Sequence, residues 1–150
     1  HGATGPSGLA RASGPDARPS AGPFMARRVV VSGADSDVGR AAAELFADRG
    51  ADLGLLYAQS RDRALATARA VAGRGRRAVM SRLDPAEVHS VRDQVEDVVD
   101  ELGGLDVLVV DGRVESRGSV LEVEPDEWRG VIGAELDASF FVIQLGARRM

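Results

Sequence analysis

The feature that most constrains the fold is a regular alternation, starting at Arg28, of short apolar runs with longer stretches of helical periodicity. Four runs have the length and the β-branched or aliphatic composition of buried strands: 29–31, 53–57, 78–80 and 107–110. Strands that alternate with helices form βαβ units, and right-handed crossovers wind such units into a parallel sheet with helices on both faces. We therefore expect an α/β, doubly wound, Rossmann-like fold of about four strands.

The helical stretches between these runs have recognisable ends. Ser60 is the expected N-cap of the second helix, and Gly103 is the expected stop of the third. Pro125 suits the first turn of the fourth helix. The apolar spacing of the first helix, which should end at Gly50, predicts a core-facing side formed by Val38, Ala42, Leu45 and Phe46.

Residues 1–24 differ from the rest of the chain in composition. The first 23 residues contain four of the six prolines and five glycines, with Leu9 as the only sizeable apolar side chain. Such a segment buries too little apolar surface to offset the entropy cost of ordering it. We expect residues 1–24 to be a disordered tail, either a leader remnant or a flexible binding segment, and residues 25–150 to form the domain.

The amino-acid composition excludes several kinds of chemistry. The 150 residues include no cysteine and no lysine, so all 19 basic side chains are arginines. Thiolate, Schiff-base and lysine-dependent P-loop chemistry are therefore excluded, and two histidines are too few to indicate a metal site. The net charge of −4 gives no attraction to nucleic acid. No membrane partner is expected, because no apolar run approaches the ~20 residues of a membrane span, and without a signal peptide we expect a cytoplasmic location.

A glycine-containing turn follows the first strand. It runs Ser32-Gly33-Ala34-Asp35-Ser36-Asp37-Val38-Gly39 and opens the first helix. Glycines at the spacing of Gly33 and Gly39 let the backbone approach a pyrophosphate, whose charge the helix N-terminus stabilises. A glycine-rich turn without a ligand would give the same short pattern.

Three further landmarks follow this turn in order. They are the run 83–91, which reads LDPAEVHSV; the run 105–109, which reads LDVLV; and a helical stretch containing Trp128, Val131, Ile132 and Leu136. With the turn, these landmarks make residues 28–150 resemble the N-terminal half of the short-chain dehydrogenases/reductases, in particular the bacterial 3-oxoacyl-carrier-protein reductases. The resemblance implies a sheet with its strands in the order 3-2-1-4. It also implies an NAD(P)-linked oxidoreductase that interconverts carbonyl and alcohol groups.

The resemblance also implies roles for particular residues. Contacts to the phosphates and ribose are implied for the turn residues Gly33, Ser36, Asp37, Val38 and Gly39. The Asp84 carboxylate would accept a hydrogen bond from the adenine amino group, while Asp111 and Gly112 would border the cofactor after the fourth strand. The segment that usually selects the cofactor, 57–61, has no carboxylate for a ribose 2′-hydroxyl, and its Ser60 and Arg61 are placed to meet a 2′-phosphate. This favours NADP over NAD, although Arg61 also fits an exposed first-turn residue.

Two departures from the family pattern bear on cofactor binding. Asp37 stands where the family has its middle glycine, and Asp35 adds a second carboxylate to the turn. Two unit charges about 4 Å apart repel by roughly 4 kcal/mol at an effective dielectric near 20. Residues 110–113, which read VDGR, replace the family sequence NNAG. We therefore expect these changes to weaken cofactor binding.

The sequence contains no catalytic residue set. In the family, a catalytic serine and a Tyr-x-x-x-Lys pair lie on the fifth strand and the following helix, and the tyrosine exchanges a proton with the substrate. This chain stops at Met150, has no lysine, and has its only tyrosine, Tyr57, in the second expected strand. We therefore expect it to be inactive alone. It would be the NAD(P)-binding half of a reductase, a non-catalytic association module, or a truncated product without a selected function.

Self-association is the remaining expectation. In the strand order 3-2-1-4, the apolar strand 107–110 lies at an open edge of the sheet, and such edges associate. The family commonly dimerises through the helix that corresponds to residues 137–150. We therefore expect a homo-oligomer that forms through this helix and this strand edge.

Overall fold

The computed structural model describes residues 22–84, 87–111 and 119–150. In chain order, the elements are β1 (Arg28–Ser32), α1 (Asp37–Asp48), β2 (Asp52–Tyr57), α2 (Arg61–Ala72), β3 (Ala78–Arg82), α3 (Val88–Leu102), β4 (Val107–Val110), α4 (Pro125–Ile132), the π-helical segment η1 (Gly133–Asp137) and α5 (Ala138–Arg149). The expected tail lies almost entirely outside the described residues. Phe24, the last residue of that tail, packs edge-on against Phe46, with 4.9 Å between ring centroids.

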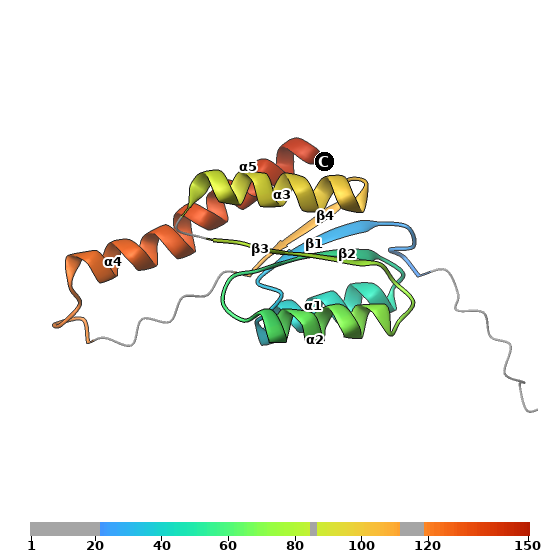
Figure 1. The fold of residues 1–150 in the computed structure, drawn as a ribbon, viewed down its shortest axis with the longest axis horizontal. Helices are drawn as coiled ribbons and strands as arrows, with labels where there is room; N and C mark the ends of the chain where they lie inside the picture. Colours follow the sequence, from blue (N-terminus) through green and yellow to red (C-terminus); the bar gives the residue numbers. More distant parts are fainter. Residues whose placement is uncertain (1–21, 85–86, 112–118) are drawn as a thin grey trace, which may run out of the picture.

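The four strands form one parallel sheet in the order β3-β2-β1-β4. Val30, at the centre of β1, lies between Gly54 of β2 and Leu108 of β4. Helices α1 and α2 cover one face of the sheet, and α3 and α5 cover the other (Figure 1). The predicted fold class and strand order are therefore confirmed.

Each face of the sheet has its own apolar core, because successive strand residues point to opposite faces. Val29, Val31 and their β2 neighbours Leu53 and Leu55 pack toward α1 and α2. Val30 packs toward α3 and α5. Central strands buried on both faces read as continuous apolar runs, which is why the sequence showed runs and not alternation.

The predicted core-facing side of α1 is wrong for Val38 and Leu45, whereas Phe46 is partly buried and packs against the core as predicted. The buried residues are Gly39, Ala43 and Ala47, whereas Val38 is 65% exposed and Leu45 is 52% exposed. The reason is steric: a Cβ built on Gly39 would overlap the Gly33 carbonyl oxygen, so α1 turns its smallest residues toward the sheet. The apolar spacing also marked Val38 and Leu45, which lie on the exposed side of α1.

An ion-pair cluster joins the starts of β1 and β4. Asp106 accepts hydrogen bonds from the Arg28 backbone N–H and side-chain Nε, both at 2.8 Å. Arg27 donates to the same carboxylate at 3.3 Å. These bonds, first of all those from the Arg28 side chain, hold the pKa of Asp106 well below its ordinary value. The cluster therefore lies at the amino-terminal ends of these strands, away from their carboxyl ends.

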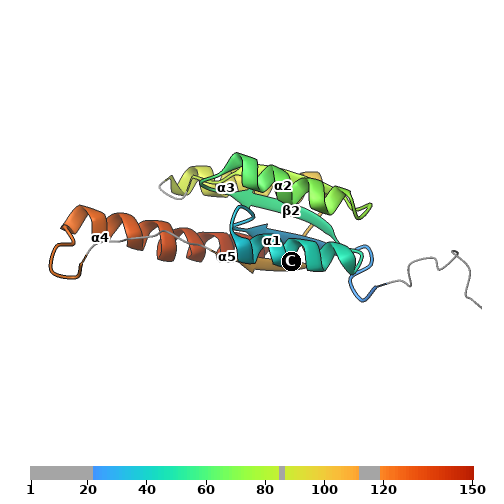
Figure 2. The same ribbon diagram turned by 90° about the horizontal axis from the view of Figure 1, so that it is seen from below.

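Helices α4, η1 and α5 run on as a single helical rod, Pro125–Arg149, where the sequence suggested two helices (Figure 2). Its α5 end packs on α3 and β4, while its α4 end projects beyond the sheet. Gly146 permits the close packing, since a Cβ there would lie 2.6 Å from Leu108 Cδ2. Among the described residues, this rod is the one helix that is long and apolar enough to cross a membrane, a statement about length and composition alone. In the fold, 22% of its most apolar 18-residue stretch is buried. The apolar runs of the sequence had indicated no helix of this kind.

Candidate functional site

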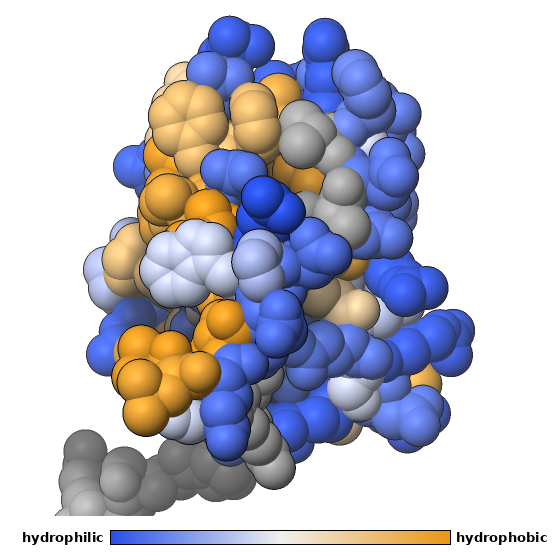
Figure 3. All heavy atoms as spheres, turned by 90° about the vertical axis from the view of Figure 1, so that its left-hand side faces the viewer, coloured by the Kyte–Doolittle hydropathy of each residue, from blue (hydrophilic) through white to orange (hydrophobic). Residues whose placement is uncertain are grey.

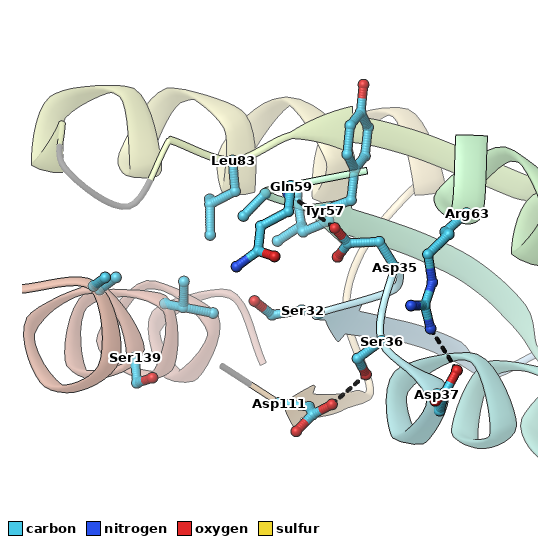
Figure 4. A pocket seen from close by; sticks show the side chains of 16 residues that line it. Ser32, Asp35, Ser36, Asp37, Tyr57, Gln59, Arg63, Leu83, Asp111 and Ser139 are labelled. Atoms are coloured by element: carbon cyan, nitrogen blue, oxygen red, sulfur yellow. Dashed lines mark hydrogen bonds and ion pairs between the residues drawn. The ribbon is translucent and has the colours of Figure 1, made fainter. Parts of the chain in front are cut away.

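A cavity of about 270 Å³ opens at the carboxyl ends of β1, β2 and β4. Its walls are the β1–α1 turn, the residues that follow β2, Asp111 after β4, and the side of the rod formed by Ala134, Ala138, Ser139 and Val142 (Figure 4). In open α/β sheets, ligands bind at this edge, where strand order reverses between β1 and β4. The position of the cavity therefore agrees with the position at which a doubly wound sheet binds its ligand.

The β1–α1 turn approaches its neighbours too closely for side chains. Gly33 has a φ of +88°, and a Cβ there would overlap the Asp111 carbonyl oxygen. The Gly33 and Ala34 N–H groups both donate to the Leu56 carbonyl oxygen at 2.9 Å. Packing within the domain thus already requires glycine at this position.

Ser36 connects three parts of the site. It is the N-cap of α1, and its Oγ accepts a hydrogen bond from Gly39 N at 2.8 Å. The same hydroxyl donates to Asp111 Oδ2 (Figure 4). Asp111 N in turn donates to Ser32 O at 2.9 Å. Two of the residues implied by the resemblance, Ser36 and Asp111, are therefore bonded to each other across 75 positions of sequence.

Asp35 has a role that sequence reasoning missed. Its Oδ2 accepts hydrogen bonds from the backbone N–H groups of Gln59 at 2.9 Å and Ser60 at 2.7 Å. The sequence suggested only that Asp35 adds charge to the turn. Nothing in the local pattern could have revealed the contact, because the partners lie 24 and 25 residues away. Segment 57–61 has no carboxylate of its own, but the Asp35 carboxylate of the β1–α1 turn lies against its backbone.

Asp37 forms an ion pair with Arg63 of α2 at the mouth of the cavity (Figure 4). The Asp37 side chain is 96% exposed and that of Arg63 is 55% exposed. The repulsion of roughly 4 kcal/mol expected for Asp37 is therefore too large, because water raises the effective dielectric around so exposed a charge. Arg63 was missed by the sequence reading, although its place three residues after the N-cap Ser60 puts it in the first turn of α2.

The other expected site residues that the structure describes lie outside the lining of the cavity. Gly39 is buried in the first turn of α1. Val38 faces solvent, Ser60 caps α2 through Arg63 N at 3.3 Å, and Arg61 is exposed at the start of α2. Asp84 is half-buried just after β3. Gly112 lies outside the described residues.

The cavity is acidic. Among the described lining residues, Asp35, Asp37 and Asp111 carry carboxylates, and Arg63 is the only cation. No group of three or more His, Cys, Asp or Glu side chains in the described part of the chain is arranged to hold a metal ion. The electrostatics therefore suit a ligand that meets backbone N–H groups and hydroxyls better than one that brings much additional negative charge.

The fold, the glycine turn and the cavity at the strand ends together define an α/β unit of the Rossmann type. The model of the short chain dehydrogenase family matches residues 27–150, so the chain belongs to that family, and the resemblance drawn from the sequence is confirmed.

Curated relatives agree with this assignment. The chain is 31% identical over 126 residues to YohF, an uncharacterised oxidoreductase of Escherichia coli K12. The aligned region covers 84% of this chain and 50% of YohF. It is 28% identical over 120 residues to the 3-oxoacyl-[acyl-carrier-protein] reductase FabG of Staphylococcus epidermidis, covering 80% of this chain and 49% of that protein. The chain therefore spans about half the length of these relatives.

Solved structures show the same fold. A short-chain dehydrogenase/reductase from Serratia marcescens superposes with a TM-score of 0.80 at 29% identity, over 85% of this chain and 52% of that one. A short-chain dehydrogenase from Burkholderia cenocepacia, determined in complex with NADP, gives a TM-score of 0.80 at 30% identity with the same coverage. In both comparisons this chain corresponds to about half of the solved protein.

Proposed function

We propose that this chain binds a nicotinamide dinucleotide at the cavity and is the NAD(P)-binding half of an oxidoreductase that interconverts carbonyl and alcohol groups. The observation that carries the proposal is the position of the cavity at the ends of β1, β2 and β4, beside the glycine turn and the N-terminus of α1. Such an N-terminus binds the negative charge of a pyrophosphate. A cytoplasmic location, as the sequence suggests, belongs to the same proposal.

Particular residues would hold the cofactor. The backbone at Gly33 and the first N–H groups of α1 would face the pyrophosphate, with Ser36 fixing the turn through Gly39 and Asp111. Adenine recognition by Asp84 and a border at Gly112 remain proposals from the resemblance. When bound, the nicotinamide ring would accept or supply hydride, and this chain's own residues would orient the cofactor.

No residue of this chain is proposed as catalytic. The chain has no lysine, and its single tyrosine, Tyr57, lies in β2 with its ring pointing away from Ser36 and Asp111 (Figure 4). A group that exchanges a proton with the substrate must lie within hydrogen-bond reach of it. We therefore expect the isolated chain to bind cofactor without turning over ketones, and activity on any substrate would belong to a longer protein.

The choice between the two cofactors is a separate matter. The sequence favours NADP through Arg61, an exposed residue that is not among those lining the cavity. Arg63 does line it, but its guanidinium pairs with Asp37. The preference for NADP therefore remains a prediction from sequence with little support from the geometry.

A second proposal is that two or more copies associate. Leu136, Phe140 and Ile143 of the rod are each more than half exposed, and β4 is an edge strand. Figure 3 shows apolar side chains gathered along one side of the end of the molecule that carries α4. This supports a homo-oligomer that forms through residues 137–150 and the edge 107–110, and it is also the observation that favours the association-module alternative.

Calorimetric titration of the isolated chain with NADH, NADPH and ADP-ribose tests the proposed function. We expect saturable 1:1 binding, with ADP-ribose displacing the dinucleotides because it carries the pyrophosphate and both riboses. The absence of heat from all three ligands up to millimolar concentration would contradict cofactor binding and favour the association module. Turnover of acetoacetyl esters by the isolated chain would contradict the assignment of no catalytic residue.

A further inference from the structure

We propose that Asp35 makes this site select NAD(H) over NADP(H), by placing a carboxylate where a ribose 2′-phosphate would have to bind. The inference rests on the proposed function and deepens it, because it names the cofactor and the residue that chooses it. It reverses the preference that segment 57–61 suggests when read as sequence alone.

The first step of the argument is position. In dinucleotide-binding α/β folds, the adenosine ribose meets the residues that follow the second strand, where a carboxylate binds the 2′-hydroxyl of NAD or an arginine accommodates the 2′-phosphate of NADP. Here those residues are Gln59 and Ser60, and both direct their backbone N–H groups to Asp35 Oδ2, at 2.9 and 2.7 Å. The carboxylate therefore lies at the ribose position, although it belongs to the β1–α1 turn (Figure 4).

The second step concerns the hydrogen-bond donors. Backbone N–H groups at the start of a helix are the groups that would bind a phosphate, and Ser60 is the N-cap of α2. At this site the N–H groups of Gln59 and Ser60 already have an anionic partner that belongs to the protein. A 2′-phosphate would have to displace Asp35 from them and leave its carboxylate without these donors.

The third step concerns charge. A phosphate monoester carries about −1.5 to −2 charges at pH 7, and it would enter a cavity whose described lining holds three carboxylates and one guanidinium. That guanidinium, Arg63, is paired with Asp37. Arg40, on the neighbouring face of α1, is paired with Glu44 at 2.7 Å. Arg63 and Arg40 are therefore both partnered by carboxylates, and Arg61 lies outside the lining. The three carboxylates of the lining therefore disfavour a phosphate.

A 2′-hydroxyl meets none of these difficulties. A carboxylate offers about four acceptor positions on its two oxygens, and both observed bonds to Asp35 end on Oδ2. The ribose hydroxyl can donate to Oδ1 while Gln59 and Ser60 keep their bonds. Asp35 thus accepts the hydroxyl of NAD(H) and repels the phosphate of NADP(H).

The experiment compares NADH and NADPH binding to the wild-type chain and to Asp35→Asn, by calorimetry at fixed ionic strength. Asparagine keeps a side-chain oxygen for the two N–H groups and removes the charge. We expect the wild type to bind NADH at least about tenfold more tightly than NADPH, and the variant to reduce this ratio at least about fivefold, chiefly by binding NADPH more tightly. Asp35→Ser, which retains a hydroxyl acceptor, should change the ratio in the same direction and serves if Asp35→Asn is poorly folded.

Asp52→Asn is the matched control. The Asp52 carboxylate also accepts a backbone hydrogen bond, from Arg77 N at 3.0 Å, but it lies at the start of β2, away from the cavity. This variant should leave the NADH to NADPH ratio unchanged.

The outcomes separate the two levels of proposal. A wild type that prefers NADPH or binds both cofactors equally would overturn the role of Asp35 while leaving dinucleotide binding intact. An unchanged ratio in both Asp35 variants, or an equal change in Asp52→Asn, would overturn it as well. If neither cofactor nor ADP-ribose binds any of the folded proteins, the proposed function is wrong, and the inference is wrong with it.

Discussion

Replacing Asp37 with glycine restores the residue that the family pattern has at this position and tests whether its carboxylate limits nucleotide binding. Asp37 is the first residue of α1, directly after the N-cap Ser36, and therefore flanks the N–H groups proposed for the pyrophosphate. Its side chain is 96% exposed and pairs with Arg63, which also lines the cavity. The substitution removes one negative charge and releases one positive charge at the same place.

The magnitude follows from the exposure of the side chain. In water, two unit charges about 4 Å apart repel by about 1 kcal/mol, in place of the ~4 kcal/mol that an effective dielectric of 20 would give. The broken ion pair offsets little, since exposed pairs contribute about 0–1 kcal/mol. A gain near 1 kcal/mol tightens binding roughly fivefold. The released Arg63 adds some attraction, so we expect Asp37→Gly to tighten NADH binding by about three- to tenfold.

Stability should change in the opposite direction. A carboxylate in the first turn of a helix is stabilised by the helix dipole, typically by about 0.3–1 kcal/mol. Asp37→Gly should therefore unfold at a slightly lower urea concentration while binding NADH more tightly. Opposite signs for stability and binding would show that the gain in affinity does not come from a better-folded protein.

The assay is a fluorescence titration of NADH at low and high ionic strength. The gain from Asp37→Gly should shrink at high salt, because exposed charges are screened. Asp126→Gly is the control: Asp126 is also in the first turn of a helix, is 98% exposed and pairs with Arg129, but does not line the cavity. Superimposed curves for wild type and Asp37→Gly, or an equal gain in Asp126→Gly, would refute the electrostatic argument.

Three other predictions concern the fold and its assembly. Gly39→Ala should destabilise the chain by about 1–3 kcal/mol in urea unfolding, because its Cβ would overlap the Gly33 carbonyl oxygen, whereas Gly130→Ala, with open space around it, should be neutral or stabilising by up to ~1 kcal/mol. The folded-state pKa of Asp106 lies below its ordinary value. The contribution of Asp106 to stability should therefore be complete above about pH 4 and be lost as the pH falls further. The urea midpoints of wild type and Asp106→Asn should differ at pH 7 and converge in acid. Ile143→Glu should reduce self-association in sedimentation velocity, and a wild type that stays monomeric at tens of micromolar would contradict the proposed oligomer.

The sequence by itself determined the order and kind of the elements. Strand and helix periodicities are local, and the run 29–31 in β1 and the apolar spacing of α3 could be read without knowing what packs against them. The glycine turn was equally readable, because a strand that leads directly into a helix requires a tight connection. Given βαβ units, right-handed crossovers predicted a parallel sheet with helices on both faces, and the family resemblance supplied the strand order β3-β2-β1-β4.

Only the tertiary structure decided which side chains meet at the site. Asp35 reaches Ser60 across 25 positions, Asp37 reaches Arg63 across 26, and Ser36 reaches Asp111 across 75. The same holds for the buried side of α1, where close approach of the backbone selected small residues over larger apolar ones. Periodicity reports how a segment folds against its own neighbours in the chain. Which carboxylate reaches which N–H group depends on the register of parallel strands and the packing of helices upon them, and no local pattern records these.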